Sequence, residues 1–413
     1  MQPLAVTHFT SVNALGTGCA ASFAALRRQR SGLTPNDFTA DPLGTWIGRV
    51  PGVEELPVRG ALSHFDCRNN RLAQMALSAD GFSAAVAEAR RRYGAHRIGV
   101  FVGTSTGGIL ETELGYRSRP GPQSPLPDNV RIQHQQNIFS AADFTRAHLD
   151  LQGPAAAVST ACSSSAKAFV QASRYIAAGL CDAAVVGGVD SLCYTTLYGF
   201  HSLQLLSAEP CRPCDAQRSG ISIGEAASFA LVARSSDGPS RAAGGAPLRA
   251  AGRDRPFEMA LLGYGESSDA HHMSSPDPQG AGARSAMAAA LGRAGLSPGQ
   301  IGFIVMHGTA TPMNDQVEDL AMHELFGAGV PASSVKGWIG HTLGAAGMMN
   351  ALAALFVLSE RVLPGTLNTR EVDPRFRSSI LLGNREQSVE RVLVNAFGFG
   401  GSNCSLIFGR LAR

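Results

Sequence analysis

Short runs of apolar residues, each ending in glycine or a polar residue, recur along the whole chain. Clear examples lie at 97–103, 183–188, 303–308 and 391–398, and they are rich in valine and isoleucine. Continuous apolar runs of this length are typical of strands buried on both faces, as in a mostly parallel sheet. Longer segments with helical spacing lie between them, so the pattern predicts an α/β fold.

Three helices can be placed from their apolar spacing. One covers residues 71–94, with an expected interruption at Gly81, and another covers 283–296 and ends at Gly295. The third follows the stretch "VSTACSSSAKAF", where the apolar residues from Ala166 onward fall near one stripe. Cys162 therefore stands where a strand passes into a helix.

The two halves of the chain show a similar rhythm of strands and helices. Between them, residues 233–258 are rich in Gly, Pro, Ser and Arg, which is typical of a linker. We therefore predict two halves, 1–245 and 246–413, built from a duplicated α/β unit.

Composition narrows the class of protein. The chain has 413 residues, of which 44% are hydrophobic and 16% charged, as expected for a compact enzyme. A net charge of +3, with no Lys/Arg-rich run, argues against nucleic acid as a partner. The N-terminus lacks a positively charged leader and no apolar run approaches about 20 residues, so we expect a cytoplasmic protein without a membrane span.

Cys162 is the candidate nucleophile. The eight cysteines show no disulfide-like rhythm, and "CRPC" at 211–214 has no second half that would complete a zinc site, so no metal is expected. The positive end of a helix lowers the pKa of a nearby thiol, and this would activate Cys162. The alternative is a buried, inert cysteine.

Two histidines, His307 and His341, lie next to glycine in the sequence. His307, in "VMHGTATPMNDQVED", comes at the carboxyl end of an apolar strand, the edge where open α/β sheets bind ligands. His341 follows Gly340 in "SSVKGWIGHTLGAAG". Each histidine alone fits a structural role, but one cysteine and two histidines together suit acyl transfer.

The stretch "NAFGFGGSN", residues 395–403, is rich in glycine. Its backbone N–H groups would be open to a ligand, and Phe399 could both gate a pocket and supply an oxyanion donor. The alternative is a tight turn with a packed phenylalanine.

These segments together resemble the elongating β-ketoacyl-acyl carrier protein synthases of the thiolase fold, over essentially the whole chain. "LLSAEPCRPCDAQRSGISIGEAASFALV" (205–232) and "GYGESSDAHHMSSPDPQG" (263–280) resemble family segments as well. The resemblance implies duplicated α/β halves in an αβαβα layered arrangement.

It also implies roles for the candidate residues. Cys162 would hold the acyl chain as a thioester, while His307 and His341 would assist decarboxylation of a malonyl thioester and stabilise the enolate. The backbone N–H groups of Cys162 and Phe399 would bind the oxyanion. By position, the resemblance further assigns support of the histidines to Lys336, Asp315 and Glu318, the pantetheine arm to Thr309 and Thr311, and the acyl entrance to Phe200 and Phe399.

Some positions bear on substrate and carrier protein. Thr106 stands where many relatives have a large apolar residue near the pocket floor, although it could instead cap a turn. Asn314 stands where the family usually has glycine; because asparagine tolerates a left-handed backbone better than most residues, the change need not disrupt the loop expected there. Arg68 and Arg71, three residues apart, would lie on one helix face and dock the acidic carrier protein, or else form an ordinary solvated helix start.

No cofactor is expected, because phosphopantetheine would arrive on the carrier protein. The region "SLCYTTLYGFHSLQLLS" looks more like synthases of the aryl polyene pigment group, so a homodimer and a heterodimer with a chain-length factor both remain open.

Two alternative functions differ from condensation in their chemistry. A non-condensing partner subunit would have an unreactive Cys162, and a hydrolytic Cys-His enzyme would release free acid.

Overall fold

The computed structural model describes residues 1–235 and 257–412. The predicted boundary between residues 245 and 246 lies outside these residues, as does most of the predicted linker. The division into two halves at that point therefore stays a prediction.

A mixed sheet of 12 strands dominates the described residues. Its strands are β1 (Leu4–Asn13), β2 (Gly16–Thr17), β5 (Ile98–Gly103), β6 (Ala155–Val158), β7 (Ala183–Asp190), β9 (Ala226–Arg234), β10 (Phe257–Ser268), β11 (Phe303–Val305), β12 (Pro331–Ser333), β14 (Ser379–Ile380), β16 (Arg391–Gly398) and β17 (Ser402–Ala412). Two small sheets contain β3 (Thr34–Pro35), β4 (Trp46–Gly48) and β8 (Ile223–Gly224), and β13 (Val362–Leu363) and β15 (Arg385–Glu386).

The strand order repeats between the two parts of the chain. The first part runs β6-β5-β7-β9-β1 and the second β12-β11-β16-β17-β10, with β1 and β10 paired where the parts meet. In both, the first two pairings are parallel and the next two antiparallel. This correspondence supports the predicted duplicated α/β unit.

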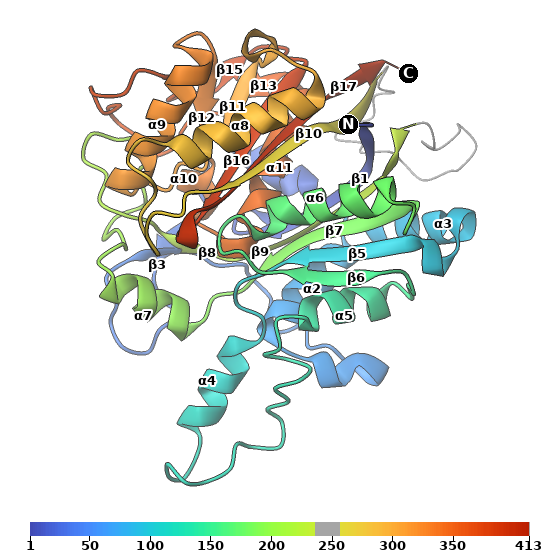
Figure 1. The fold of residues 1–413 in the computed structure, drawn as a ribbon. Helices are drawn as coiled ribbons and strands as arrows, with labels where there is room; N and C mark the ends of the chain where they lie inside the picture. The colour runs from blue at the N-terminus through green and yellow to red at the C-terminus, as the bar shows by residue number, and fades with distance from the viewer. Residues whose placement is uncertain (236–256, 413) are drawn as a thin grey trace.

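The helices form three layers around the sheet (Figure 1). They are α1 (Cys19–Arg27), α2 (Arg68–Ser78), α3 (Phe82–Tyr93), α4 (Ile109–Arg117), α5 (Ser140–His148), α6 (Ser164–Ala177), α7 (Tyr194–Ser202), α8 (Ala281–Ala294), α9 (Pro312–Phe326), α10 (Lys336–Ile339) and α11 (Ala346–Glu360). α6 and α11 lie between the two parts of the sheet, α2, α3 and α5 cover one outer face, and α8 and α9 cover the other. The predicted αβαβα layering is confirmed.

Most predicted elements appear close to their expected bounds. The helix at 71–94 is divided into α2 and α3 at Gly81, and α8 ends just before Gly295. β11 ends at Val305, so His307 lies two residues beyond the strand rather than at its end. The expected loop at Asn314 is not found, because this residue lies inside α9.

The central layer forms the largest hydrophobic core. It joins side chains of α6 and α11 to strands from both parts of the sheet. The segment Leu343–Glu360 is long and apolar enough to cross a membrane, yet 89% of it is buried inside the protein. Its composition is explained by this central position, so α11 is a core helix.

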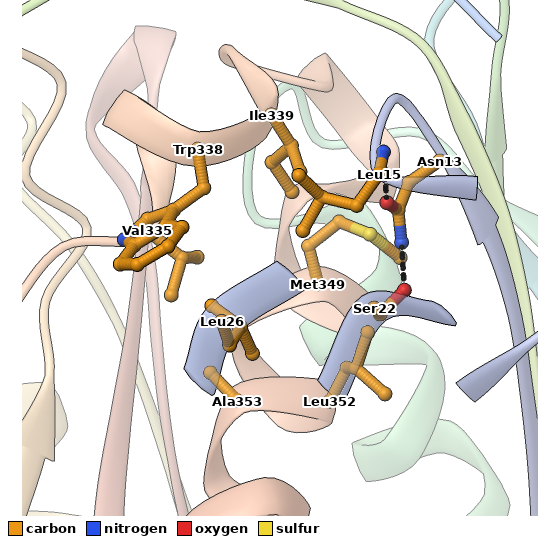
Figure 2. A pocket seen from close by; sticks show the side chains of 10 residues that line it. All are labelled: Asn13, Leu15, Ser22, Leu26, Val335, Trp338, Ile339, Met349, Leu352 and Ala353. Carbon is orange, nitrogen blue, oxygen red and sulfur yellow. Dashed lines mark hydrogen bonds between the residues drawn. The ribbon is translucent and has the colours of Figure 1, made fainter. Parts of the chain in front are cut away.

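A small hollow lies beneath α10 (Figure 2), and its lining is almost entirely apolar side chains from α1, α10 and α11. The side-chain amide of Asn13 is hydrogen-bonded to nearby groups: it accepts a hydrogen bond from the Leu15 N–H and donates one to the Ser22 hydroxyl. Trp338 fixes α10 above the hollow and donates from its ring nitrogen to the Gly365 carbonyl at 3.1 Å. This packing holds the short helix that begins with Lys336.

Candidate active site

The predicted site residues gather at one edge of the sheet. Five of them follow the carboxyl ends of strands, the edge where α/β folds place their ligands. The strands and the residues that follow them are β5 with Thr106, β6 with Cys162, β11 with His307, β12 with Lys336 and β16 with Phe399.

Cys162 lies in a sharp turn between β6 and α6. Ala161 has a φ of 52°, a left-handed conformation that is uncommon for a residue with a side chain. The neighbouring loop comes very close, because a Cβ on Gly398 would lie 2.8 Å from the Thr160 carbonyl oxygen and 3.2 Å from the Cys162 nitrogen. Only glycine allows this approach.

His341 is the histidine that contacts the sulfur. Its Nε2 lies 3.0 Å from Cys162 Sγ. The backbone of His341 is fixed on both sides, since its N–H donates to Ser222 and its carbonyl accepts from Gly224. Gly340 has a φ of 76° and packs against the same backbone, so the loop places this histidine firmly.

His307 stands beside His341 and is held by its backbone. The two imidazole centroids are 5.4 Å apart, with ring planes at 82°. Glu318 accepts hydrogen bonds from the His307 and Gly308 N–H groups at 2.8 and 2.7 Å, and Lys336 Nζ donates to the His307 carbonyl. The hydrogen bonds that Lys336 and Glu318 make here go to the backbone of His307 and Gly308, while their support of the histidines in catalysis stays a prediction.

Burial controls the charge state of this cluster. The pKa of the Cys162 thiol is raised to about 11, chiefly by desolvation and only partly offset by Lys336 and the Phe399 backbone. Desolvation also lowers the pKa of both histidines well below the usual value. The predicted lowering of the thiol pKa is therefore not found, because desolvation favours the neutral thiol. A neutral His341 can instead accept the thiol proton during attack.

Lys336 and Glu318 are buried as well. Desolvation lowers the pKa of Lys336 to about 8 and raises that of Glu318 to about 7. Each group attracts the other electrostatically, and neither has a solvent shell. Their role is best described as a buried scaffold that keeps His307 in place.

The thiol and the two imidazoles could also ligate a metal ion, because one ligand atom from each lies within 4.8 Å of the others. A metal-bound histidine normally donates its second ring N–H to an acceptor. Nδ1 of both histidines is buried without a hydrogen-bond partner, so that support is missing. The absence of a metal requirement stays a prediction.

Phe399 lies at the mouth of the site. Its backbone acts to lower the pKa of the Cys162 thiol, and the residue is 37% exposed. The Phe200 ring from α7 lies 5.7 Å away, so two elements far apart in sequence meet at the predicted entrance. Cys162 itself is only 6% exposed.

Thr309 and Thr311 flank a turn that Asp315 stabilises. The two hydroxyls are 2.9 Å apart, and the Asp315 carboxylate accepts hydrogen bonds from the N–H groups of Thr309, Ala310 and Cys214. The threonines are thus available as a pair beside the histidines, while their binding of pantetheine stays a prediction.

Asp190 is a functional residue that the sequence interpretation missed. It ends β7 and is 1% exposed, and its carboxylate accepts from Ser105 and Thr106 on one side and Ala345 on the other. The Thr106 hydroxyl donates to it at 2.8 Å, which favours the turn-stabilising alternative for Thr106. An acidic residue two positions after the buried run at 183–188 was the available signal.

The two arginines predicted to dock the carrier protein have different surroundings. Arg68 and Arg71 both lie in the first turn of α2, but Arg68 is 4% exposed and forms a two-point ion pair with the buried Glu225. Docking by Arg68 was therefore wrong, because its charge faces the interior. Arg71 is half-buried and pairs with Asp66, so it remains the candidate for carrier contact.

This difference predicts unequal losses of stability. Arg68→Ala leaves the Glu225 carboxylate buried without its cation, so we expect the free energy of unfolding to fall by about 3–5 kcal/mol. The matched variant Arg71→Ala removes a partly solvated pair and should cost about 1 kcal/mol or less. Denaturant unfolding of both proteins measures this, and equal losses would contradict the assignment.

The raised thiol pKa predicts how Cys162 reacts with pH. At pH 7.5 nearly all of the thiol is protonated, and the thiolate fraction rises about tenfold per pH unit below the pKa. Alkylation of Cys162 by iodoacetamide, followed by peptide mass, should therefore accelerate steadily from pH 7 to 9.5. A rate that levels off below pH 8 would mean that the thiol pKa is lowered.

The sequence of this chain is similar to those of known protein families. Residues 63–238 match the model of the β-ketoacyl synthase N-terminal domain, and residues 259–370 match that of the C-terminal domain. The 3-oxoacyl-[acyl-carrier-protein] synthase 2 of Vibrio cholerae is 33% identical over 332 residues, which cover 77% of each chain.

Two solved structures are similar over almost the entire chain. The ketosynthase ApeO, in complex with its chain length factor ApeC from Xenorhabdus doucetiae, superposes with a TM-score of 0.86 at 36% identity and covers 99% of this chain and 98% of that one. The ishigamide ketosynthase/chain length factor gives a TM-score of 0.87 at 26% identity, with 99% of each chain covered.

Proposed function

Because this chain belongs to the β-ketoacyl synthase family, we propose that Cys162, His307 and His341 form its condensing centre. As an elongating 3-oxoacyl-acyl carrier protein synthase, the protein is an acyltransferase that extends an acyl chain by decarboxylative condensation. The observation that carries the assignment of residues is the 3.0 Å contact between Cys162 Sγ and His341 Nε2, with His307 next to it.

Loading begins when the Cys162 sulfur attacks the thioester carbonyl of the acyl carrier. His341 Nε2 takes the thiol proton, so the attacking sulfur becomes a thiolate only when the substrate is present. The developing oxyanion is held by the N–H groups of Cys162 and Phe399, and one such donor contributes roughly 2.7–4 kcal/mol. The carrier thiol leaves with a proton, and the acyl group remains on Cys162.

Condensation then uses a malonyl thioester. Loss of carbon dioxide leaves an enolate, whose negative oxygen accepts hydrogen bonds from the neighbouring imidazoles. The enolate carbon attacks the Cys162 thioester, a new carbon–carbon bond forms, and the bond from the carbonyl carbon to sulfur breaks. The sulfur leaves as a thiolate and takes up one proton from solvent. Two neutral, buried histidines suit this step because they stabilise charge without adding a permanent positive charge nearby.

The pathway and partner form the second part of the proposal. The likeness to a ketosynthase solved with its chain length factor supports a heterodimer in which this chain is the catalytic subunit. Together with the resemblance to aryl polyene synthases, it supports an unsaturated or aryl acyl chain as substrate. The carrier protein supplies phosphopantetheine, and a cytoplasmic location and the absence of any resident cofactor belong to this proposal too.

Acyl loading tests this choice of substrate. Purified protein is mixed with carrier proteins bearing saturated, polyene and aryl chains, alone and with a candidate chain length factor, and the mass of Cys162 peptides is followed. Preference for polyene or aryl chains in the presence of the partner supports the pigment pathway. Equal or better loading by saturated chains without a partner would place the enzyme in fatty acid synthesis.

A further inference from the structure

Helix α7 packs against a small core cluster through Leu197, Tyr198 and Phe200. Of the residues Tyr194–Ser202 only Leu197 is buried, yet the helix carries Phe200, whose ring meets that of Phe399 at the acyl entrance. A helix with so few buried contacts opens easily unless its ends are held. The position of Phe200 therefore depends on what fixes α7.

Glu113 of α4 fixes the N-terminus of α7. Its Oε2 accepts the Tyr194 N–H at 2.9 Å, and its Oε1 accepts the Thr195 N–H at 2.6 Å as well as the Thr195 hydroxyl. The first N–H groups of a helix have no partner within it, and a carboxylate is the group that best satisfies them. Cys193, the residue at the N-cap position, makes no capping hydrogen bond with its side chain.

Arg117 adds a second contact between the same two helices. Its guanidinium lies 4.1 Å from the centre of the Tyr194 ring, over the residue whose N–H binds Glu113. Glu113 and Arg117 are four residues apart on α4, so they lie on one face of that helix. Together they hold the start of α7, whereas Phe200 lies near its other end.

We propose that Glu113 is a positioning residue for the acyl entrance: it caps α7 from outside, keeps Phe200 against Phe399, and thereby sets which acyl chains reach Cys162. The proposal rests on the proposed function, because it concerns the same entrance. Glu113 does not touch the reacting atoms and acts only through α7.

Two variants test the capping role. Glu113→Ala removes the cap, and adding Cys193→Ser restores one within α7, since serine at an N-cap binds the N–H three residues on. Hydrogen exchange of residues 194–203 should be about tenfold faster in Glu113→Ala, and the double variant should return it to near the wild-type rate. Glu88→Ala, at an exposed ion pair on α3, is the matched control and should change nothing.

The same proteins are then compared in acyl loading. In Glu113→Ala the ratio of kcat/KM for long over short acyl carriers should shift about fivefold, mainly through KM, and the double variant should restore it. Unchanged exchange or an unchanged ratio in Glu113→Ala would overturn the proposal, as would failure of the double variant to restore them. Hydrogen exchange needs no acyl chemistry, so absence of loading in the wild type would count against the proposed function alone.

Discussion

Cys162→Ala takes up no acyl group from any carrier protein, and its condensation rate falls by at least about 10⁴-fold. The reason is that, among the described residues, Cys162 is the cysteine whose sulfur is hydrogen-bonded to a histidine, so the variant has no activated thiol to accept the acyl chain. Intact mass after incubation with acyl carrier protein measures the result. Acyl uptake by this variant would show that another residue is the nucleophile.

A control separates loss of chemistry from loss of fold. Cys162→Ser keeps a side chain of similar size in the same turn, so its unfolding curve should match that of the wild type. Its hydroxyl is a far weaker nucleophile at neutral pH, and acyl uptake should remain very slow. A Cys162→Ser protein that loads as fast as the wild type would contradict the role of the thiol.

His307→Ala separates the two halves of the reaction. The sulfur contacts His341 and not His307, so we expect loading of Cys162 to stay within about threefold of the wild type. Decarboxylation and condensation should fall by about 10²–10⁴-fold, since one of the two imidazoles beside the enolate is lost. Loading is followed by mass, and carbon dioxide release from labelled malonyl carrier protein reports the second step.

The matched variant His341→Ala should show the other pattern. Without the nitrogen 3.0 Å from the sulfur, loading itself should slow about 10²-fold or more. If both histidine variants lose loading to the same extent, the division of roles between them is wrong.

Two of the candidate catalytic residues could be predicted from sequence because each follows a recognisable apolar run. Cys162 and His307 come just after such runs, and the edge at which they meet follows from the α/β pattern. Which histidine contacts the sulfur could not be predicted. It depends on Gly340 with its φ of 76° and on the hydrogen bonds that tie His341 to Ser222 and Gly224.

Properties set by distant neighbours were the ones that sequence reasoning misjudged. The position of Cys162 before a helix suggested a lowered pKa, but desolvation by the surrounding layers raises it. Arg68 and Arg71 have the spacing of one helix face, yet only the fold brings Glu225 against Arg68. Glu113 likewise binds the start of α7 through a tertiary contact that no local sequence pattern predicts.

The most direct test of the account follows the mass of Cys162 through one complete turnover. The wild-type protein is loaded with an acyl carrier protein and then given malonyl carrier protein, while the product is analysed in parallel. We predict that Cys162 first gains the acyl mass and then loses it as a 3-oxoacyl carrier protein two carbons longer appears with one carbon dioxide. Release of the acyl group as free acid, or failure of Cys162 to gain it, would contradict the condensing function.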